Sequence, residues 1–166
     1  MFTELERQSY SFDCGEHTVT LRYDIAALTR LEQCGLSYED IFDERITGRE
    51  LVAFLEAGCG ELPDRAAAVL RQTGAQELWR HIRAAVLLSL PVRDPLVIDI
   101  PDNPNAAPDM KRLRCFICDV MRKPEEFFWH STMRELCERW QCFAEVKGYA
   151  EKPRRMELFD MEGMEK

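Results

Sequence analysis

The chain has 166 residues, of which 46% are hydrophobic and 31% are charged, and its formal net charge is -8. This composition excludes a disordered or fibrous protein, and it allows one domain or two small ones. The acidic excess gives no electrostatic reason to bind nucleic acid, because phosphate is repelled. There is no secretory-signal pattern in Met1–Tyr10, and the longest apolar run, Ala84–Leu90, is too short to cross a bilayer. We therefore expect a cytoplasmic protein without membrane or nucleic-acid partners.

The first predicted element is a β-hairpin. An alternating polar and apolar run covers Thr18–Tyr23, and a turn signal precedes it at Asp13–Glu16. Asp24 then stands at the N-cap position of a helix that continues to Gly35, where a left-handed residue ends it. Ser37 is in turn the expected N-cap of a short second helix.

A capping box predicts the start of the third helix. The Thr47 hydroxyl can accept a hydrogen bond from the third amide of the helix, while the Glu50 carboxylate accepts one from the cap residue. The helix is expected to end at the glycines of Gly58–Gly60. A short fourth helix is expected to begin at Pro63–Asp64.

A second capping box, formed by Thr73 and Gln76, is expected to open a longer fifth helix. The apolar residues of this helix recur at a spacing that places them on one buried stripe. The stripe consists of Leu78, Ile82, Ala85, Val86 and Ser89.

A proline-rich segment, Pro91–Pro108, separates this helical region from the rest of the chain. Its five prolines each remove a hydrogen-bond donor and disfavour helix, so the segment is predicted to be a linker. Its apolar middle, Leu96–Ile100, is expected to lie extended against one of the two flanking parts. The linker would therefore be partly ordered.

Three further helices are predicted after the linker. The first covers Arg112–Arg122, the second begins at Pro124, and the third follows a capping box formed by Thr132 and Glu135. The face of the first helix that is expected to be buried consists of Leu113, Phe116, Ile117 and Val120.

The predicted fold class is thus mainly α. It comprises an N-terminal β-hairpin with a helical bundle over residues 1–90, a linker over 91–110 and a small three-helix module over 111–150. A flexible charged tail follows over 151–166.

Two cysteines separated by two residues, with later thiol and imidazole groups, raise the possibility of a zinc site. Such a set can enclose a tetrahedral ion. Against this, Phe116 and Ile117 continue an apolar helix face, and no glycine-containing knuckle surrounds the pair. We predict free, buried thiols without a metal, and a zinc-binding regulator remains an alternative. The candidate ligands are Cys115, Cys118, Cys137 and either His130 or Cys142.

No catalytic constellation is found. His17, His81 and His130 fall on different predicted elements, and none is paired in sequence with a nucleophile. The glycines of Gly58–Gly60 are not preceded by a strand, so they do not form a phosphate-binding loop. We therefore predict a non-enzymatic protein without a cofactor.

An aromatic cluster within residues 127–143 provides the candidate binding residues. Aromatic side chains are favoured as interface anchors, but a small helical module must also bury some of them. Core packing is favoured for the cluster as a whole, and Trp129 is the preferred exposed anchor. The candidate partner-binding residues are Phe127, Phe128, Trp129, Trp140 and Phe143.

Three segments resemble the tail assembly chaperones of long-tailed phages and prophages. They are LRYDIAALTRLEQCGLSYEDIFDE at residues 21–44, TGRELVAFLEAGCG at residues 47–60, and EEFFWHSTMRELCERW at residues 125–140. The third is similar to a Phe-Trp-x-x-Thr-x-x-Glu-Leu pattern in the C-terminal extension of the long form of such chaperones. The first two contain helix placement and apolar spacing but no catalytic signature.

The resemblance implies a protein that binds the tape measure protein, keeps its apolar helices soluble and helps to recruit tail tube subunits. It implies a location in the host cytoplasm, absence from the mature virion and no cofactor, and a homo-oligomer remains open. The alternatives are a phage-encoded inhibitor of a host protein and the zinc-binding regulator described above. Genome neighbourhood would separate the tail assembly chaperone from the phage-encoded inhibitor.

Overall fold

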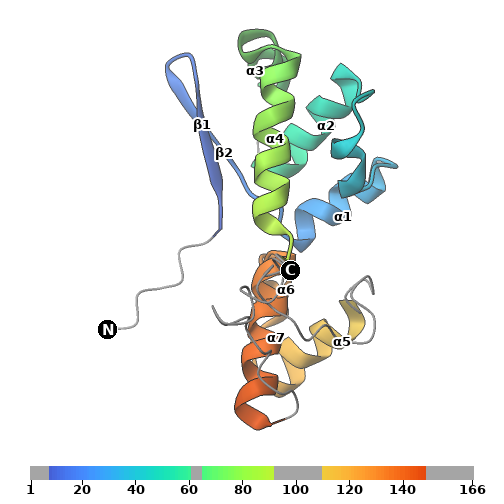
Figure 1. Ribbon diagram of the computed structural model, residues 1–166, viewed down its shortest axis with the longest axis vertical. Helices are drawn as coiled ribbons and strands as arrows, with labels where there is room; N and C mark the ends of the chain where they lie inside the picture. The colour runs from blue at the N-terminus through green and yellow to red at the C-terminus, as the bar shows by residue number, and fades with distance from the viewer. Residues whose placement is uncertain (1–7, 61–64, 92–109, 149–166) are drawn as a thin grey trace, which may run out of the picture.

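The computed structural model describes residues 8–60, 65–91 and 110–148 (Figure 1). The protein is mainly α-helical and begins with a two-stranded hairpin, as the sequence predicts. The expected features at Pro63–Asp64, in the linker and in the charged tail lie outside the described residues. No helix of the described part of the chain is long and apolar enough to span a membrane.

The hairpin pairs β1 (Tyr10–Cys14) with β2 (His17–Leu21) in antiparallel register, with Tyr10 opposite Leu21. Its two-residue loop begins with Gly15, whose φ of 62° suits a residue without a Cβ atom. Alternate side chains point to one face, and this face packs against the helices beside it in Figure 1. The buried residues of this face are Phe12, Cys14, Val19 and Leu21.

Each of the next three helices begins directly after a residue whose side chain caps it. The Asp24 carboxylate accepts a hydrogen bond of 2.8 Å from the Ala27 amide and thereby starts α1 (Ile25–Gln33). A 3-10 helix, η1 (Tyr38–Phe42), begins at Ser37 with a complete capping box. The Thr47–Glu50 box is present as predicted at the start of α2 (Gly48–Cys59).

The next two helices are α3 (Ala66–Thr73) and α4 (Ala75–Ser89). All five residues of the predicted α4 stripe are buried. The predicted Thr73–Gln76 box is wrong, because Thr73 belongs to the last turn of α3 and Gly74 caps α4 without a side-chain hydrogen bond. The Thr73 hydroxyl donates instead to Cys14 Sγ at 3.4 Å, so a tertiary contact replaces the local one.

Gly58 does not end its helix. It is buried within α2, which continues to Cys59 and ends at Gly60, a residue with a φ of 75°. A Cβ atom at Gly58 would lie 2.9 Å from Cζ of Tyr23. The Tyr23 ring thus packs directly on the α2 backbone, which leaves no space for a side chain at residue 58. The Tyr23 hydroxyl also donates a hydrogen bond of 2.8 Å to the Phe54 carbonyl.

The chain after the linker forms α5 (Met110–Cys115), η2 (Phe116–Val120), α6 (Glu125–Trp129) and α7 (Met133–Lys147). The Thr132–Glu135 box opens α7 as predicted. The predicted helix to Arg122 ends earlier, because η2 is a π-helix and Arg122 has a φ of 55°. The wider turn changes the direction of later side chains, so Val120 is 54% exposed instead of buried.

Two clusters of buried apolar residues organise these elements. The larger lies among the hairpin and helices α1 to α4; we call this part of the chain the first body (residues 10–60 and 65–90). The smaller lies among α5, η2, α6 and α7, which we call the second body (residues 110–148). The smaller cluster also contains Ile25, the first residue of α1. The two bodies therefore share apolar contacts, and they lie end to end in Figure 1.

Candidate partner-binding groove between the two helical bodies

Arg22 lies just after β2 and extends its guanidinium group across the junction of the two bodies. One of its nitrogens lies 2.8 Å from Glu135 Oε2, and the same group donates to the carbonyl oxygens of Gln8 and His130 at 2.9 Å each. Both charged side chains are more than four-fifths buried, at 17% and 18% exposure. Glu135 also completes the capping box of α7, so one carboxylate serves both the helix start and the junction.

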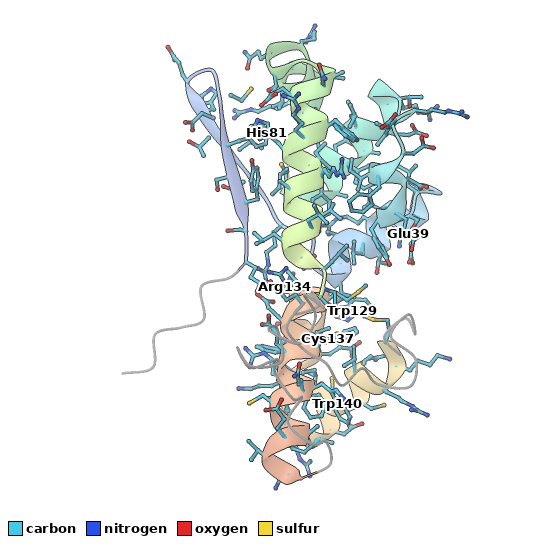
Figure 2. The ribbon with its side chains drawn as sticks, in the orientation of Figure 1. Glu39, His81, Trp129, Arg134, Cys137 and Trp140 are labelled. Atoms are coloured by element: carbon cyan, nitrogen blue, oxygen red, sulfur yellow. The ribbon has the colours of Figure 1, made fainter. Side chains whose placement is uncertain are left out.

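Backbone groups also join the two bodies. The Ile25 amide donates to the Ser131 carbonyl at 3.0 Å, and Asp24 forms an isolated antiparallel bridge with Thr132. Arg134 lies at the junction in Figure 2, where its side chain donates to the Leu90 carbonyl at 2.9 Å. That carbonyl lies at the C-terminal end of α4, which favours a cation electrostatically. These contacts hold the two bodies in direct apposition.

A groove of about 310 Å³ lies beside these contacts, between α1 and η1 on one side and α5 and α6 on the other. Most of its lining is apolar, and the polar and charged groups lie among the side chains of α1, η1 and α5. Apolar concavities with few polar groups are the usual form of binding sites. The lining residues are Ile25, Leu28, Thr29, Glu32, Tyr38, Met110, Lys111, Arg114, Phe128, Trp129 and Met133.

Trp129 is held in place within this lining. Its indole Nε1 donates to Glu125 Oε1 at 3.1 Å, and the same oxygen lies 2.8 Å from a guanidinium nitrogen of Arg114. The ring also packs at right angles to Phe128, with 5.3 Å between centroids. On the opposite side of the groove, burial raises the pKa of Tyr38, and the neighbouring Glu39 carboxylate raises it further.

The structure divides the predicted aromatic cluster. Phe128 and Trp129 line the groove, Phe128 being buried and Trp129 half-buried. Phe127 is half-buried and lies under the cations of Lys123 and Arg139.

Trp140 and Phe143 do not line the groove; both rings pack on Phe116, each with 5.0 Å between centroids. Trp140 is 46% exposed, so it is a more exposed ring than Trp129, and Figure 2 shows it well away from Trp129.

Several groove residues were missed by reasoning from the sequence. They include Ile25 and Leu28 on α1, Met110 on α5 and Met133 on α7. Their helical spacing indicates only that they are apolar and inward. They meet in one groove only because residues more than 100 positions apart in the sequence are in contact, as Ile25 and Ser131 are.

The candidate zinc ligands do not form a metal site in the structure. Within residues 8–60, 65–91 and 110–148, no group of three or more His, Cys, Asp or Glu side chains is placed to hold a metal ion. His130 Nδ1 lies 3.3 Å from Asp24 Oδ2 at the junction. Cys115 and Cys142 are exposed free thiols, which corrects the expectation of burial, while Cys118 and Cys137 are half-buried.

His81 has a structural role within the first body. His81 stacks on Phe12 with 4.2 Å between centroids, and its Nδ1 lies 2.9 Å from the Tyr10 hydroxyl. It thus packs the hairpin onto α4, and His17 is exposed on β2. The three histidines lie at separate places, in agreement with their separation in the sequence.

A second cavity, of about 360 Å³, lies within the first body and is lined by Trp79 and Glu44 among others. Trp79 is already engaged, because its Nε1 donates to the Ile41 carbonyl at 2.8 Å and Arg83 lies over its ring. The junction groove is the better candidate site, since its lining is more apolar and includes two of the predicted aromatic residues.

Comparison with known proteins finds no counterpart of this arrangement. The chain matches no protein-family model, and neither a curated protein nor a solved structure is significantly similar to it.

Proposed function

We propose that this protein is a non-catalytic tail assembly chaperone of a long-tailed phage or prophage. In this role it binds the tape measure protein in the host cytoplasm, helps to recruit tail tube subunits and is absent from the mature virion. The single observation that carries the proposal is the apolar groove between the two bodies, which contains Phe128 and Trp129 from the segment that resembles the chaperone extension.

The physical argument concerns apolar helices. A tape measure protein is expected to expose long apolar helical faces before a tail tube covers them, and such faces aggregate in water. A groove between helices can cover part of such a face and remove it from water, at about 25 cal/mol per Å² of apolar surface. Groove side chains from α1, α5, α6 and α7 would contact successive turns of the bound helix.

Co-expression of the full chain with a helical fragment of the tape measure protein from the same phage or prophage tests the proposal. We expect the fragment to become soluble and to co-purify with the chain. The variant Met133→Glu places a charge on the groove floor, yet an acidic residue suits the first turn of α7, so the fold should persist. We expect this variant to lose most of the solubilising effect.

Val120→Glu is the matched control, because Val120 is an exposed apolar residue that does not line the groove. It should solubilise the fragment as well as the unmodified chain does. A tape measure fragment that stays insoluble with every variant would contradict the proposed function. Equal solubilisation by Met133→Glu and Val120→Glu would show that another surface does the binding.

A further inference from the structure

The short helix α6 begins with Glu125 and ends with Trp129, and the side chains of these two residues meet. Residues four positions apart lie on the same face of a helix, so the two are neighbours there. Pro124 precedes the helix with a φ of -62°, and its ring restricts the backbone from which Glu125 extends. Figure 2 shows Trp129 at the end of the second body that meets the first body.

One oxygen of the Glu125 carboxylate accepts hydrogen bonds from two groove residues. Oε1 lies 3.1 Å from the Trp129 indole nitrogen and 2.8 Å from a guanidinium nitrogen of Arg114 on α5. Arg114 and Trp129 both line the groove, whereas Glu125 does not. The carboxylate therefore ties a side chain of α5 to a side chain of α6 at the same wall of the groove.

The hydrogen bond to Trp129 fixes an orientation that the apolar contacts leave open. The indole ring meets the Phe128 ring at 74°, with 5.3 Å between centroids, and an edge-on contact of this kind can also form when the indole is turned over. Turning the indole over moves its N–H group away from Glu125 and exchanges the edge that faces the groove. Because the indole N–H favours an acceptor, the carboxylate selects one of these two orientations.

These contacts should matter more for binding than for the stability of the fold. The Arg114 and Glu125 side chains are 52% and 49% exposed, and an ion pair at such an exposed place contributes little to stability because water screens it. Binding is affected differently, since a partner can bind only those molecules in which the ring has the required orientation. The apparent affinity falls in proportion to the fraction of molecules in that orientation.

We infer that Glu125 is a positioning residue, which holds the Trp129 indole in the orientation that the groove needs to bind an apolar helix of its partner; this inference rests on the proposed function. Arg114 holds the carboxylate in turn through a charge-assisted hydrogen bond. Without the carboxylate the ring takes more than one orientation, and binding must first select one of them. The groove is thus pre-organised by a side chain that is not part of its lining.

NMR of the indole N–H groups in the full chain tests the positioning of the ring. The chain has three tryptophans, and the variant Trp129→Phe identifies the signal of Trp129. Glu125→Ala should move this signal upfield, because the hydrogen bond to the carboxylate is lost. The signals of Trp79 and Trp140 should stay in place, which also shows that both bodies remain folded.

Two further variants provide the matched controls. Glu125→Gln keeps a carbonyl oxygen that can accept from the indole, so the Trp129 signal should stay close to its original position. Glu126→Ala removes the same charge from the same first turn of α6, but at an exposed residue that does not line the groove. This second variant should leave the Trp129 signal unchanged.

Affinity is measured with a designed amphipathic helical peptide that has a leucine face and glutamine elsewhere. The peptide is uncharged, so direct attraction to Glu125 cannot cause a difference between variants. If the binding orientation falls to about one molecule in five without the carboxylate, Glu125→Ala binds the peptide about fivefold more weakly. Glu125→Gln and Glu126→Ala should each bind it within about twofold of the unmodified chain.

An unchanged Trp129 signal or unchanged affinity in Glu125→Ala, an equal loss of affinity in Glu125→Gln or Glu126→Ala, or no peptide binding by the unmodified chain would each overturn the inference. The expected results together with a tape measure fragment that stays insoluble would contradict the proposed function alone. Solubilisation of the fragment that Met133→Glu abolishes, with an unchanged Trp129 signal in Glu125→Ala, would contradict only this inference.

Discussion

Arg22 and Glu135 are 113 residues apart in the sequence, and their side chains meet at 2.8 Å across the junction of the two bodies. Arg22 also donates to backbone carbonyls of Gln8 and His130, so one guanidinium group joins three segments. Because this pair lies beside the groove, the geometry of the groove depends on contacts that neither body could make alone.

Arg22→Ala should destabilise the junction. The variant removes these hydrogen bonds and leaves the largely buried Glu135 carboxylate without its cation, at an expected cost of about 1–3 kcal/mol in the free energy of unfolding. Urea unfolding measures the change. The control is Arg80→Ala, since the Arg80–Glu77 pair is 61% and 50% exposed and should contribute less than about 0.5 kcal/mol. Equal effects of the two variants would contradict the assigned role.

Gly58→Ala should disrupt the contact between α2 and Tyr23. The new methyl group would lie 2.9 Å from Tyr23 Cζ and 3.3 Å from Leu21 Cδ2, and both side chains are fully enclosed. Overpacking of this kind costs about 1–3 kcal/mol of stability, measurable by thermal or urea unfolding. Gly48→Ala is the matched control in the same helix, because its methyl group would be 3.7 Å from Leu70. We expect that control to be neutral or slightly stabilising.

Stability should also fall at alkaline pH. Burial raises the pKa of the Cys59 thiol to about 11 from its ordinary value of 9.0. The folded state thus holds the proton more tightly than the unfolded state does. The associated stability is complete below pH 9 and is lost as the pH rises toward 11. Burial also raises the pKa of Tyr23, which acts in the same direction above pH 10.

Urea unfolding between pH 8 and pH 11 checks this prediction. Cys59→Ala should show a shallower decline of the unfolding free energy than the unmodified chain, whereas Cys34→Ala, at an exposed thiol, should leave the decline unchanged. An identical pH dependence for all three proteins would contradict the pKa shift.

The predicted aromatic residues should separate into structural and surface groups. Phe128→Ala removes a ring that is 2% exposed, and it should cost about 3–5 kcal/mol of stability. Trp140→Ala alters a ring that is 46% exposed, and it should cost about 1 kcal/mol. Trp140 lies outside the groove, so its replacement should leave solubilisation of the tape measure fragment unchanged. Loss of solubilisation by this variant would instead place the binding surface around Trp140, outside the groove.

The elements whose boundaries the sequence predicts well are those with local causes. Asp24, Ser37, Thr47 and Thr132 each accept a hydrogen bond from an amide two or three residues ahead, so a short stretch of sequence is enough to identify them. The capping box predicted at Thr73 does not form, because the Thr73 hydroxyl donates a hydrogen bond to Cys14 on the distant hairpin. The exposure of Val120 also differs from prediction, because helical periodicity does not reveal a π-helical turn.

The sequence by itself determined the mainly helical class, the hairpin, most helix starts and the segment that contains the candidate aromatic residues. Capping, turn formation and amphipathic spacing act over a few residues, so they can be recognised without knowing the fold. Only the tertiary structure decided that Ile25 joins the second body, that Glu135 pairs with Arg22, and that Phe128 and Trp129 share a groove with Leu28. These contacts arise when distant segments exclude water from a shared surface, and a local pattern does not specify which segments will meet.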